Sequence, residues 1–306
     1  MKIYPLASVI IPNYNGEKVI CDCLQSVYAS DYPNFEVILA DDCSLDNSLD
    51  KVKARFPFVK VIKNRRNRGF VRTVNKGIKN SLGEIIALLN MDTVVTKNWL
   101  SELAKVLIYD KDIAIAGSKI LNSDGKTIQY AGGRIIDNGI SLHIGRGEID
   151  QGQYNALREV DYVCGASMGF RRGLLKEIGY FNPSYAPLYY EDADLAFRAK
   201  KAGYKIVFVP SSVLLHKENY STQGLTARFY YCYHKSRIVF LANNYSLKYL
   251  LKDFLKKEFL WFKDFQPREY KKQLILAYLS GFISLPVFVS KRLVGSMSIK
   301  KGRKIE

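Results

Sequence analysis

Short apolar runs alternate with polar segments along about the first ninety residues of the chain. The fourth run, residues 85–89, has five consecutive apolar residues between Gly83 and a polar exit. Such a run is typical of a strand buried on both faces of a parallel sheet. The pattern therefore predicts βαβ units, with Ser44 as an N-cap, strands at 7–12, 35–40, 58–62 and 85–89, and helices at 17–28, 44–55 and 73–81.

The pattern changes after a helix predicted at 98–109. Gly, Asn and Asp turns now separate short apolar stretches, which indicates hairpins; the candidate strands are 113–117, 119–121, 127–129, 134–136, 141–145, 160–163 and 167–170. A short helix at 171–178, a helix from about 189 to 202, and strands at 205–209 and 213–215 follow. We expect this half to lie against the first and to supply the second wall of a cleft.

These elements predict an α/β fold with a mostly parallel central sheet flanked by helices and a C-terminal helical extension. The expected domains are 1–220, composed of the halves 1–110 and 111–220, and a basic, aromatic helical extension at 221–306. Within the extension, residues 250–265 mix Phe, Trp and Leu with Lys in an amphipathic pattern.

A stretch of 17 residues without a charge, 274–290, lies at the bottom of the length range for a membrane span and contains Gly281 and Pro286. We therefore favour a cationic, aromatic segment that lies on the membrane surface over one that crosses it. The alternative is that these helices pack on the first domain or form a homodimer contact.

Charge changes this picture in one respect. The chain of 306 residues has a formal net charge of +17, and residues 248–306 carry 14 Lys and Arg against 5 Asp and Glu. This balance favours acidic partners such as nucleotides or an anionic membrane; nucleic-acid binding rests on charge alone and is not favoured. The five cysteines lack CxxC spacing and the N-terminus lacks a signal-peptide pattern, which suits a cytoplasmic protein.

Polar residues follow three of the predicted parallel strands: Asn13 and Asn15, Asp41 and Asp42, and Asn90 and Asp92. In open α/β sheets, ligands bind outside the carboxyl ends of the strands. A carboxylate there can hold a hard cation, although a loop aspartate that caps the next helix is the alternative for Asp92.

The chain lacks both a GxGxxG after the first strand and a GxxxxGK[ST]. Phosphates must therefore be bound in another way. A cation at Asp92 and positive side chains of the next loop would serve, unless that loop is only a solvated face; the loop contains Arg65, Arg66, Arg68 and Arg72.

A second group of acids, Glu191, Asp192 and Asp194, opens the helix predicted after residue 189. The helix dipole favours acids in a first turn, which is a sufficient structural reason for them. The preceding Tyr189 and Tyr190 also suggest a partly desolvated pocket, in which a carboxylate has a raised pKa and acts as a base.

With His216 after the last strand, these segments resemble the family 2 glycosyltransferases over roughly residues 6–220, and among them the rhamnosyltransferase-like members of surface-polysaccharide synthesis. Seven segments carry the resemblance: 8–16, 41–48, 67–70 with 75–78, 89–93, 165–172, 190–195, and 203–204 with His216. The resemblance implies the nucleotide-diphospho-sugar transferase (GT-A) fold, with a nucleotide-binding half at 1–110 and an acceptor half at 111–220.

The resemblance also implies roles for single residues. Asp192 would be the catalytic base, and Asp92 would end the DXD motif that holds Mg²⁺ or Mn²⁺, joined by His216. Asp41 would accept a hydrogen bond from a pyrimidine base. The implied nucleotide contacts are Pro12, Tyr14, Asn15, Asp41, Asn67, Gly69, Asn75, Asn90 and Met91. The implied acceptor and sugar pocket consists of Gly165, Ala166, Tyr190 and Glu191.

The implied reaction is metal-dependent and inverting. It moves a sugar from a UDP- or dTDP-linked donor to a hydroxyl of a lipid-linked or cell-surface glycan, with the protein attached peripherally to the cytoplasmic face of the membrane. Asn90 stands where the metal motif usually begins with an acid, so a catalytically weak or inactive scaffold subunit is the alternative. Asp42 stands where the family often has Asn, and Asn182 where it commonly has Asp.

Overall fold

The computed structural model describes residues 4–217 and 226–281, which fall into two compact units. The first, here called the sheet unit, comprises residues 4–135, 141–187 and 191–217. The second, the helical unit, comprises 136–140, 188–190 and 226–281. The predicted domain boundary at residue 220 lies outside the described residues.

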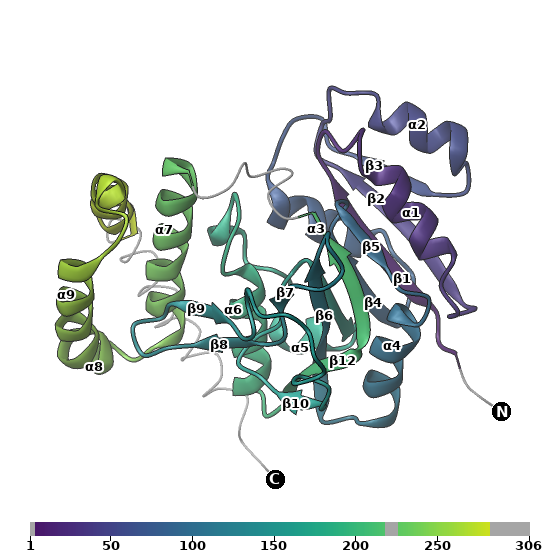
Figure 1. Ribbon diagram of the computed structural model, residues 1–306. Coiled ribbons are helices and arrows are strands. Elements are labelled where there is room, and N and C mark those ends of the chain that lie inside the picture. The colour runs from purple at the N-terminus through teal and green to yellow at the C-terminus, as the bar shows by residue number, and fades with distance from the viewer. Residues whose placement is uncertain (1–3, 218–225, 282–306) are drawn as a thin grey trace, which may run out of the picture. The chain divides into compact units, whose positions relative to one another are not determined.

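The first half of the sheet unit has the predicted βαβ architecture. Four parallel strands lie in the order β4-β1-β2-β3; they are β1 (Ala7–Asn13), β2 (Phe35–Asp41), β3 (Lys60–Lys63) and β4 (Ile85–Leu89). The connecting helices are α1 (Ile20–Tyr28), α2 (Ser48–Arg55) and α3 (Phe70–Lys79). Figure 1 shows α1 and α2 on one side of these strands and α3 on the other. All five side chains of β4 are buried, as its apolar run predicts.

The prediction that Ser44 caps α2 is wrong. The helix begins at Ser48, with Asn47 as its N-cap residue. The Ser44 hydroxyl instead donates to Asp41 Oδ1 at 2.5 Å, and residues 43–47 lie outside the helix. An N-cap motif and a side-chain-stabilised turn use the same residue types, so the pattern alone cannot separate them.

The second half of the unit extends the same sheet instead of forming a separate wall. Strand β11 (Ser167–Arg171) lies antiparallel between β4 and β6 (Ile113–Asn122), and β12 (Lys205–His216) runs parallel to β6. Helix α4 (Trp99–Tyr109) precedes β6, and β5 (Thr93–Val95) pairs with β12. The ten-stranded sheet is therefore mixed but mostly parallel in its first half.

Two predicted strand breaks are absent. Residues 113–117 and 119–121 belong to one strand, because the Ser118 hydroxyl is satisfied inside the sheet by those of Ser167 and Ser212, each at 2.8 Å. Residues 205–209 and 213–215 are likewise one strand, with an irregularity between Val209 and Val213. The strand predicted at 160–163 does not form.

The remaining elements of the sheet unit are short. They are β7 (Ile128–Tyr130), β8 (Gly133–Ile135), β9 (Ser141–His143), β10 (Arg158–Glu159), α5 (Leu174–Ile178), the 3-10 turn η1 (Pro183–Tyr185) and α6 (Glu191–Lys201).

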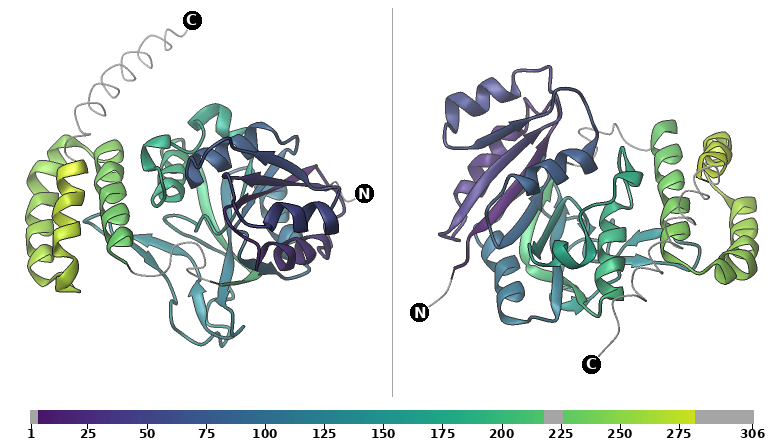
Figure 2. Two further views of the ribbon diagram at one scale, coloured as in Figure 1. Left: turned by 90° about the horizontal axis from the view of Figure 1, so that it is seen from above. Right: turned by 180° about the vertical axis from the view of Figure 1, so that it is seen from behind.

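The helical unit consists of α7 (Ala227–Asn244), α8 (Leu247–Tyr249), the π-helical turn η2 (Leu250–Phe254), α9 (Leu255–Asp264), the 3-10 turn η3 (Arg268–Tyr270) and a helix whose described part is 271–281. Both views of Figure 2 show α7 and α9 side by side. Between them lies a buried ion pair, in which Arg237 Nη1 donates to Glu258 Oε2 at 2.9 Å and to the Asn138 carbonyl at 3.0 Å. The Arg237 guanidinium also lies over the Trp261 ring, 4.9 Å from its centroid.

None of the helices within residues 4–217 and 226–281 is both long and apolar enough to cross a membrane. The uncharged stretch predicted at 274–290 is described only as far as residue 281, where it is helical. Its remainder, 282–290, lies outside the described residues.

Candidate active site

The exits of β1 and β2 form a dense hydrogen-bond network. The Asn13 amide donates to Asp41 Oδ1 at 2.9 Å and to Ser44 Oγ at 3.0 Å. Asp41 Oδ2 accepts from the backbone N–H groups of Cys43 and Ser44, each at 3.1 Å. The fully buried Asp41 carboxylate therefore organises the turn after β2. Its hydrogen bond to a pyrimidine base stays a prediction.

Asp42 folds the arginine-bearing loop between β3 and α3. Its Oδ1 accepts from Asn64 Nδ2 and from the Arg68 N–H, and its Oδ2 accepts from the Gly69 N–H, all at 2.8 Å. A carboxylate has two oxygens for these three donors, whereas the amide of an asparagine has one. A carboxylate therefore suits this position. Arg65, Arg66 and Arg68 of this loop are exposed, and so is Arg72, which was predicted in the loop but lies on α3.

The turn after β1 brings an aromatic ring to the same edge. Tyr14 is 41% exposed, and the next residue, Asn15, has a left-handed backbone (φ 54°). Asn15 Oδ1 accepts from the Leu45 N–H at 2.9 Å, which joins the turns after β1 and β2. A Cβ at Gly16 would lie 2.7 Å from Met91 Sδ, so the turn after β4 approaches as closely as a glycine permits. The exits of β1, β2 and β4 are thus adjacent.

Asp92 and His216 face each other although they are 124 positions apart. Strand β5 pairs with β12 so that Thr93 lies opposite His216. His216 Nε2 is 3.2 Å from Asp92 Oδ1, and both side chains are buried. This pairing, rather than any local motif, brings the two residues together.

Gln129 on β7 sets the orientation of the His216 ring. Gln129 Oε1 lies 2.7 Å from His216 Nδ1, and Gln129 Nε2 donates to Asn122 Oδ1 at 3.3 Å. An amide oxygen only accepts, so Nδ1 carries a proton. Nε2 then faces Asp92 either as an N–H donor or, when a cation is bound, with its lone pair as a second acceptor. Two acceptors that face each other in this way fit a cation between them. Gln129 is not predicted from the sequence, because nothing in the short strand candidate marks it as buried.

The donor set suits a divalent cation that is completed by other ligands. Carboxylate oxygen and imidazole nitrogen bind ions of the Mg²⁺ or Mn²⁺ class, and an acceptor for Nδ1–H is the usual outer partner of a metal-binding histidine. Within residues 4–217 and 226–281, no group of three or more His, Cys, Asp or Glu side chains could hold a metal. Asp92 and His216 would therefore leave most coordination positions to phosphate oxygens and water.

Asp192 lies in the first turn of α6. Its Oδ2 accepts from the Gly165 N–H at 2.9 Å, and its Oδ1 from the Ala193 N–H at 2.7 Å. Burial raises the pKa of Asp192 above its ordinary value, while the hydrogen bonds from Gly165 and Ala193 oppose that rise. A carboxylate with a raised pKa is suited to accept a proton from a hydroxyl.

The Asp192 carboxylate is linked to the turn that carries the candidate metal ligand. The Asn90 N–H donates to the Ala166 carbonyl at 2.9 Å, and Ala166 adjoins Gly165, whose N–H binds Asp192. A Cβ at Gly165 would lie 3.6 Å from Asp192 Oδ2. The predicted base and the predicted metal motif are therefore held together by backbone hydrogen bonds.

Several predicted site residues have structural partners. The Asn75 side chain donates to the Phe181 carbonyl at 2.7 Å and accepts from the Phe181 N–H at 3.2 Å. Asn67 Oδ1 accepts from the Gly69 N–H at 3.2 Å. Tyr190 belongs to the helical unit, where its hydroxyl donates to the Gly139 carbonyl at 2.8 Å. Their predicted contacts with ligands stay predictions, as do those of Pro12, at the end of β1, and of Glu191, which is buried.

Two polar residues near the candidate base have a purely structural explanation. Asp194 accepts from the Tyr185 hydroxyl at 2.9 Å and from Arg198 Nε at 2.8 Å, so it ties α6 to η1. Asn182 Oδ1 accepts from the Ser184 N–H at 3.0 Å and caps η1. Of the acids that open α6, Asp194 is thus occupied in holding the fold.

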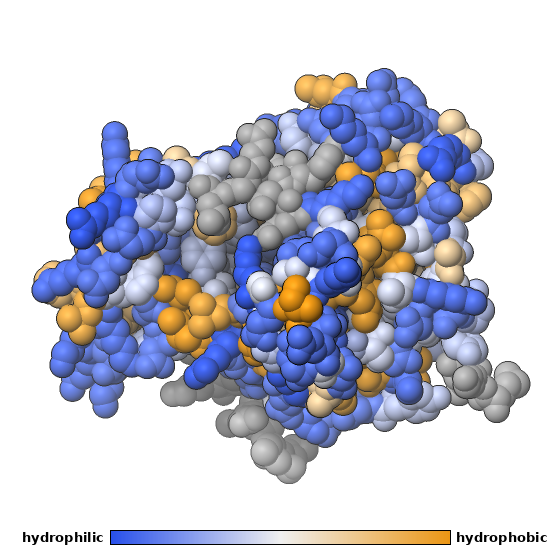
Figure 3. Space-filling view, viewed as in Figure 1, coloured by the Kyte–Doolittle hydropathy of each residue, from blue (hydrophilic) through white to orange (hydrophobic). Residues whose placement is uncertain are grey.

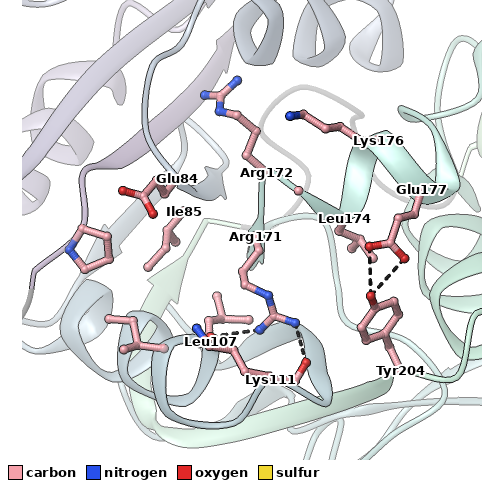
Figure 4. A pocket seen from close by; sticks show the side chains of 13 residues that line it. Glu84, Ile85, Leu107, Lys111, Arg171, Arg172, Leu174, Lys176, Glu177 and Tyr204 are labelled. Atoms are coloured by element: carbon pink, nitrogen blue, oxygen red, sulfur yellow. Dashed lines mark hydrogen bonds between the residues drawn. The ribbon is translucent and has the colours of Figure 1, made fainter.

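A pocket of about 330 Å³ lies at the other end of β4, around Glu84 and Ile85 (Figure 4). Its arginines are engaged with backbone carbonyls: Arg171 donates to those of Leu107 (2.9 Å) and Lys111 (2.7 Å). No predicted site residue lines this pocket. It is therefore separate from the candidate active site, which follows the carboxyl end of β4.

Comparison with known proteins finds similarity to a family of enzymes, to curated proteins and to solved structures. A family model described as glycosyl transferase family 2 matches residues 8–179. An uncharacterized protein of Sinorhizobium fredii, y4gI, is 28% identical over 71% of this chain and 25% of its own length. The N-acetylglucosaminyl-diphospho-decaprenol L-rhamnosyltransferase of Mycobacterium tuberculosis is 27% identical over 69% of this chain and 75% of its own length.

Among solved structures, GalNAc-T7 with UDP, GalNAc and Mn²⁺ is similar over 95% of this chain and 57% of that chain, with a TM-score of 0.64 at 19% identity. The likeness confirms the predicted GT-A fold. In several curated relatives the chain spans less than half of the relative's length, for example 25% in the Sinorhizobium protein and 44% in a pneumococcal glycosyltransferase.

Proposed function

We propose that this chain, which belongs to glycosyl transferase family 2, is an inverting transferase that moves a sugar from a UDP- or dTDP-linked donor to a hydroxyl of a lipid-linked or cell-surface glycan. One observation carries the proposal. The facing pair Asp92 and His216 and the carboxylate of Asp192 are connected through the hydrogen bonds of Asn90, Ala166 and Gly165 at one edge of the sheet.

Some residues of this edge would bind the sugar donor, and Asp192 would act on the acceptor. The exposed Tyr14 ring would pack against the nucleotide base, and Asp92 and His216 would hold the divalent cation. When bound, that cation supplies positive charge to the diphosphate leaving group. Asp192 would take the proton of the acceptor hydroxyl as its oxygen attacks the anomeric carbon from the side opposite the diphosphate, which inverts the configuration.

The lipid-linked acceptor and the cellular location are proposed on separate grounds. The mycobacterial relative is named for a decaprenol-linked sugar, which supports a lipid-linked acceptor here. All five cysteines are free thiols, as suits a reducing compartment. We therefore propose that the protein acts at the cytoplasmic face of the membrane and is attached peripherally.

The stereochemical outcome tests this reaction. We expect ¹H NMR of the product formed from UDP- and dTDP-sugars and a prenyl-diphosphate-linked GlcNAc acceptor to show an anomeric configuration opposite to that of the donor. A product that retains the donor configuration would contradict the role of Asp192 as a base. Failure of every donor to react, with intact nucleotide binding, would favour the alternative of a scaffold subunit, for which Asn90 in the metal motif is the supporting feature.

Replacing Gln129 tests how the metal ligand is positioned. Gln129→Met keeps the volume but removes the acceptor for His216 Nδ1–H. Loss of such an outer partner typically weakens metal binding about 10- to 100-fold. We expect this loss in Mn²⁺ titrations followed by electron paramagnetic resonance in the presence of UDP. The control Gln151→Met changes an exposed loop residue and should leave the affinity unchanged. An unchanged Mn²⁺ affinity in Gln129→Met would show that Gln129 does not position His216 for the cation.

A further inference from the structure

We infer that an exposed apolar ridge along α8, η2 and α9 docks on the surface of an anionic lipid bilayer. The ridge consists of Leu247, Leu251, Leu255 and Phe259, whose exposed fractions lie between 48% and 61% for the leucines and reach 62% for Phe259. Four large apolar side chains at a constant spacing of four residues are unlike the scattered exposed leucines of an ordinary surface.

The ridge is distinct from the face that holds the helical unit together. Phe254 is buried against Ile238 and Leu241 of α7, and Glu258 is buried in its pair with Arg237. Leu255 and Phe259 each follow one of these buried positions by one residue, so they project to the side of the buried face, and Leu247 and Leu251 are each 61% exposed. In an α-helix of 3.6 residues per turn, side chains four residues apart do not point in quite the same direction, so a row of them rotates slowly around the helix axis. The π-helical turn at 250–254 has more residues per turn, which reduces this rotation. The backbone therefore helps to keep the ridge aligned.

Lysines run along the ridge. Lys248, Lys252 and Lys256 each follow a ridge leucine by one position, and all three are exposed. The Lys263 ammonium lies 4.6 Å from the centroid of the Phe259 ring. Apolar side chains bordered by lysines are the pattern of helices that lie in a membrane interface, where the acyl boundary receives the apolar groups and anionic headgroups attract the cations. Figure 3 shows apolar side chains at the surface of α9 among hydrophilic ones.

The positive charge beside the ridge favours an anionic bilayer over a second copy of the chain or another segment of the same chain. In a two-fold contact between two copies, the same patch meets itself, so the lysine row of one copy would approach that of the other. Residues 291–306 of this chain carry six Lys and Arg against one Glu, so this charged segment too would be repelled by the row. An anionic bilayer complements both the apolar and the cationic part of the surface.

The neighbouring helix also carries exposed apolar residues. Ile275, Leu276 and Leu279 are exposed on residues 271–281. This helix packs on α9, since Phe262 and Tyr278 are in contact and the Lys271 ammonium lies 5.3 Å from the centroid of the Phe262 ring. The helix that carries the ridge is thus packed against a second helix that also bears exposed apolar side chains.

The test is sedimentation of the full chain with vesicles of phosphatidylcholine alone or with one third phosphatidylglycerol. We expect binding to the anionic vesicles only, weakened by high salt. The ridge variant Leu251→Gln/Phe259→Gln and the row variant Lys248→Glu/Lys252→Glu/Lys256→Glu should each bind at least about tenfold more weakly. Matched controls on the sheet unit are Leu82→Gln/Leu157→Gln, at exposed leucines, and Lys97→Glu/Lys126→Glu/Lys176→Glu, at exposed lysines; both should bind like the parent.

Equal binding by the ridge variant and the parent would overturn the inference, as would the absence of binding to anionic vesicles. If the parent had twice the monomer mass in solution and the ridge variant had the monomer mass, the ridge would be assigned to a contact with a second copy instead. The inference rests on the membrane attachment in the proposed function, yet vesicle binding needs neither donor nor acceptor. Sugar transfer without vesicle binding refutes the ridge alone, and vesicle binding without transfer refutes the proposed reaction alone.

Discussion

Replacement of Asp192 by Asn should lower kcat for sugar transfer by about a hundredfold to ten-thousandfold, the range that a positioned general base contributes. The amide can still accept from the Gly165 N–H, which binds the carboxylate at 2.9 Å in the parent, so the local backbone should persist. Nucleotide affinity should change little, because most of the proposed nucleotide contacts follow strands β1, β2 and β4, whereas Asp192 is on α6. Single-turnover transfer and UDP titration measure the two quantities separately.

Asp194→Asn provides the contrasting variant on the same helix. Asp194 holds Tyr185 and Arg198, so its replacement should lower the melting temperature and leave kcat near the parent value. Asp192→Asn should do the reverse. If Asp192→Asn and Asp194→Asn each lose both activity and stability to a similar extent, the assignment of Asp192 as the base and of Asp194 as a structural residue is wrong.

The pH dependence follows from the raised pKa of Asp192. The base form is lost as the pH falls through that pKa, so kcat/KM should decline on an acid limb that lies above the ordinary aspartate value of about 4. Folding favours the protonated carboxyl, so ionisation costs stability as the pH rises from the ordinary value through the raised one. Asp192→Asn should therefore lose the acid limb and be at least as stable as the parent at neutral pH.

The second large effect is expected in the helical unit. Arg237→Met leaves the buried Glu258 carboxylate without its cationic partner, and breaking a buried ion pair in this way typically costs about 3–5 kcal/mol. The substitution also removes the donor to the Asn138 carbonyl and the contact with the Trp261 ring. Urea denaturation followed through tryptophan fluorescence measures the loss.

Lys257→Met is the matched control. It removes the ion pair with Asp137 one residue before Glu258, but both partners are exposed, and such pairs contribute about 0–1 kcal/mol. The double variant Arg237→Met/Glu258→Leu should recover part of the loss, because no charge is then left buried. Similar destabilisation by Arg237→Met and Lys257→Met would contradict the structural role assigned to the buried pair.

The parallel half of the sheet was predictable because each of its strands coincides with a short apolar run in the local sequence. Residues 85–89 are apolar throughout and lie in the centre of the sheet, buried on both faces. The mixed half was harder to predict because its polar residues are satisfied by distant partners. Ser118 resembles a turn residue in the sequence, but hydroxyls 49 and 94 positions away accommodate it inside β6.

The candidate site was predictable in its residues more than in its geometry. Asp92, His216 and Asp192 were recognised from motif order, yet only the pairing of β5 with β12 explains why the first two face each other. Gln129 was missed because its role depends on a contact with a residue 87 positions away. Conversely, hydrogen bonds to backbone groups 26 to 106 positions away show that Asp42 and Asn75 shape the loops around the site, which their positions in the motifs do not indicate.

The most direct test of the account is a ligand-dependent thermal unfolding series with UDP, dTDP, GDP and CMP, each with and without Mn²⁺, on the parent and on Asp92→Asn. A ligand present at about a hundred times its dissociation constant stabilises the folded state by about 2.7 kcal/mol, which shifts the transition measurably. We predict a Mn²⁺-dependent shift with UDP or dTDP in the parent and its loss in Asp92→Asn. The absence of a shift with every nucleotide, or an equal shift in Asp92→Asn, would contradict a metal-assisted nucleotide site at this edge of the sheet.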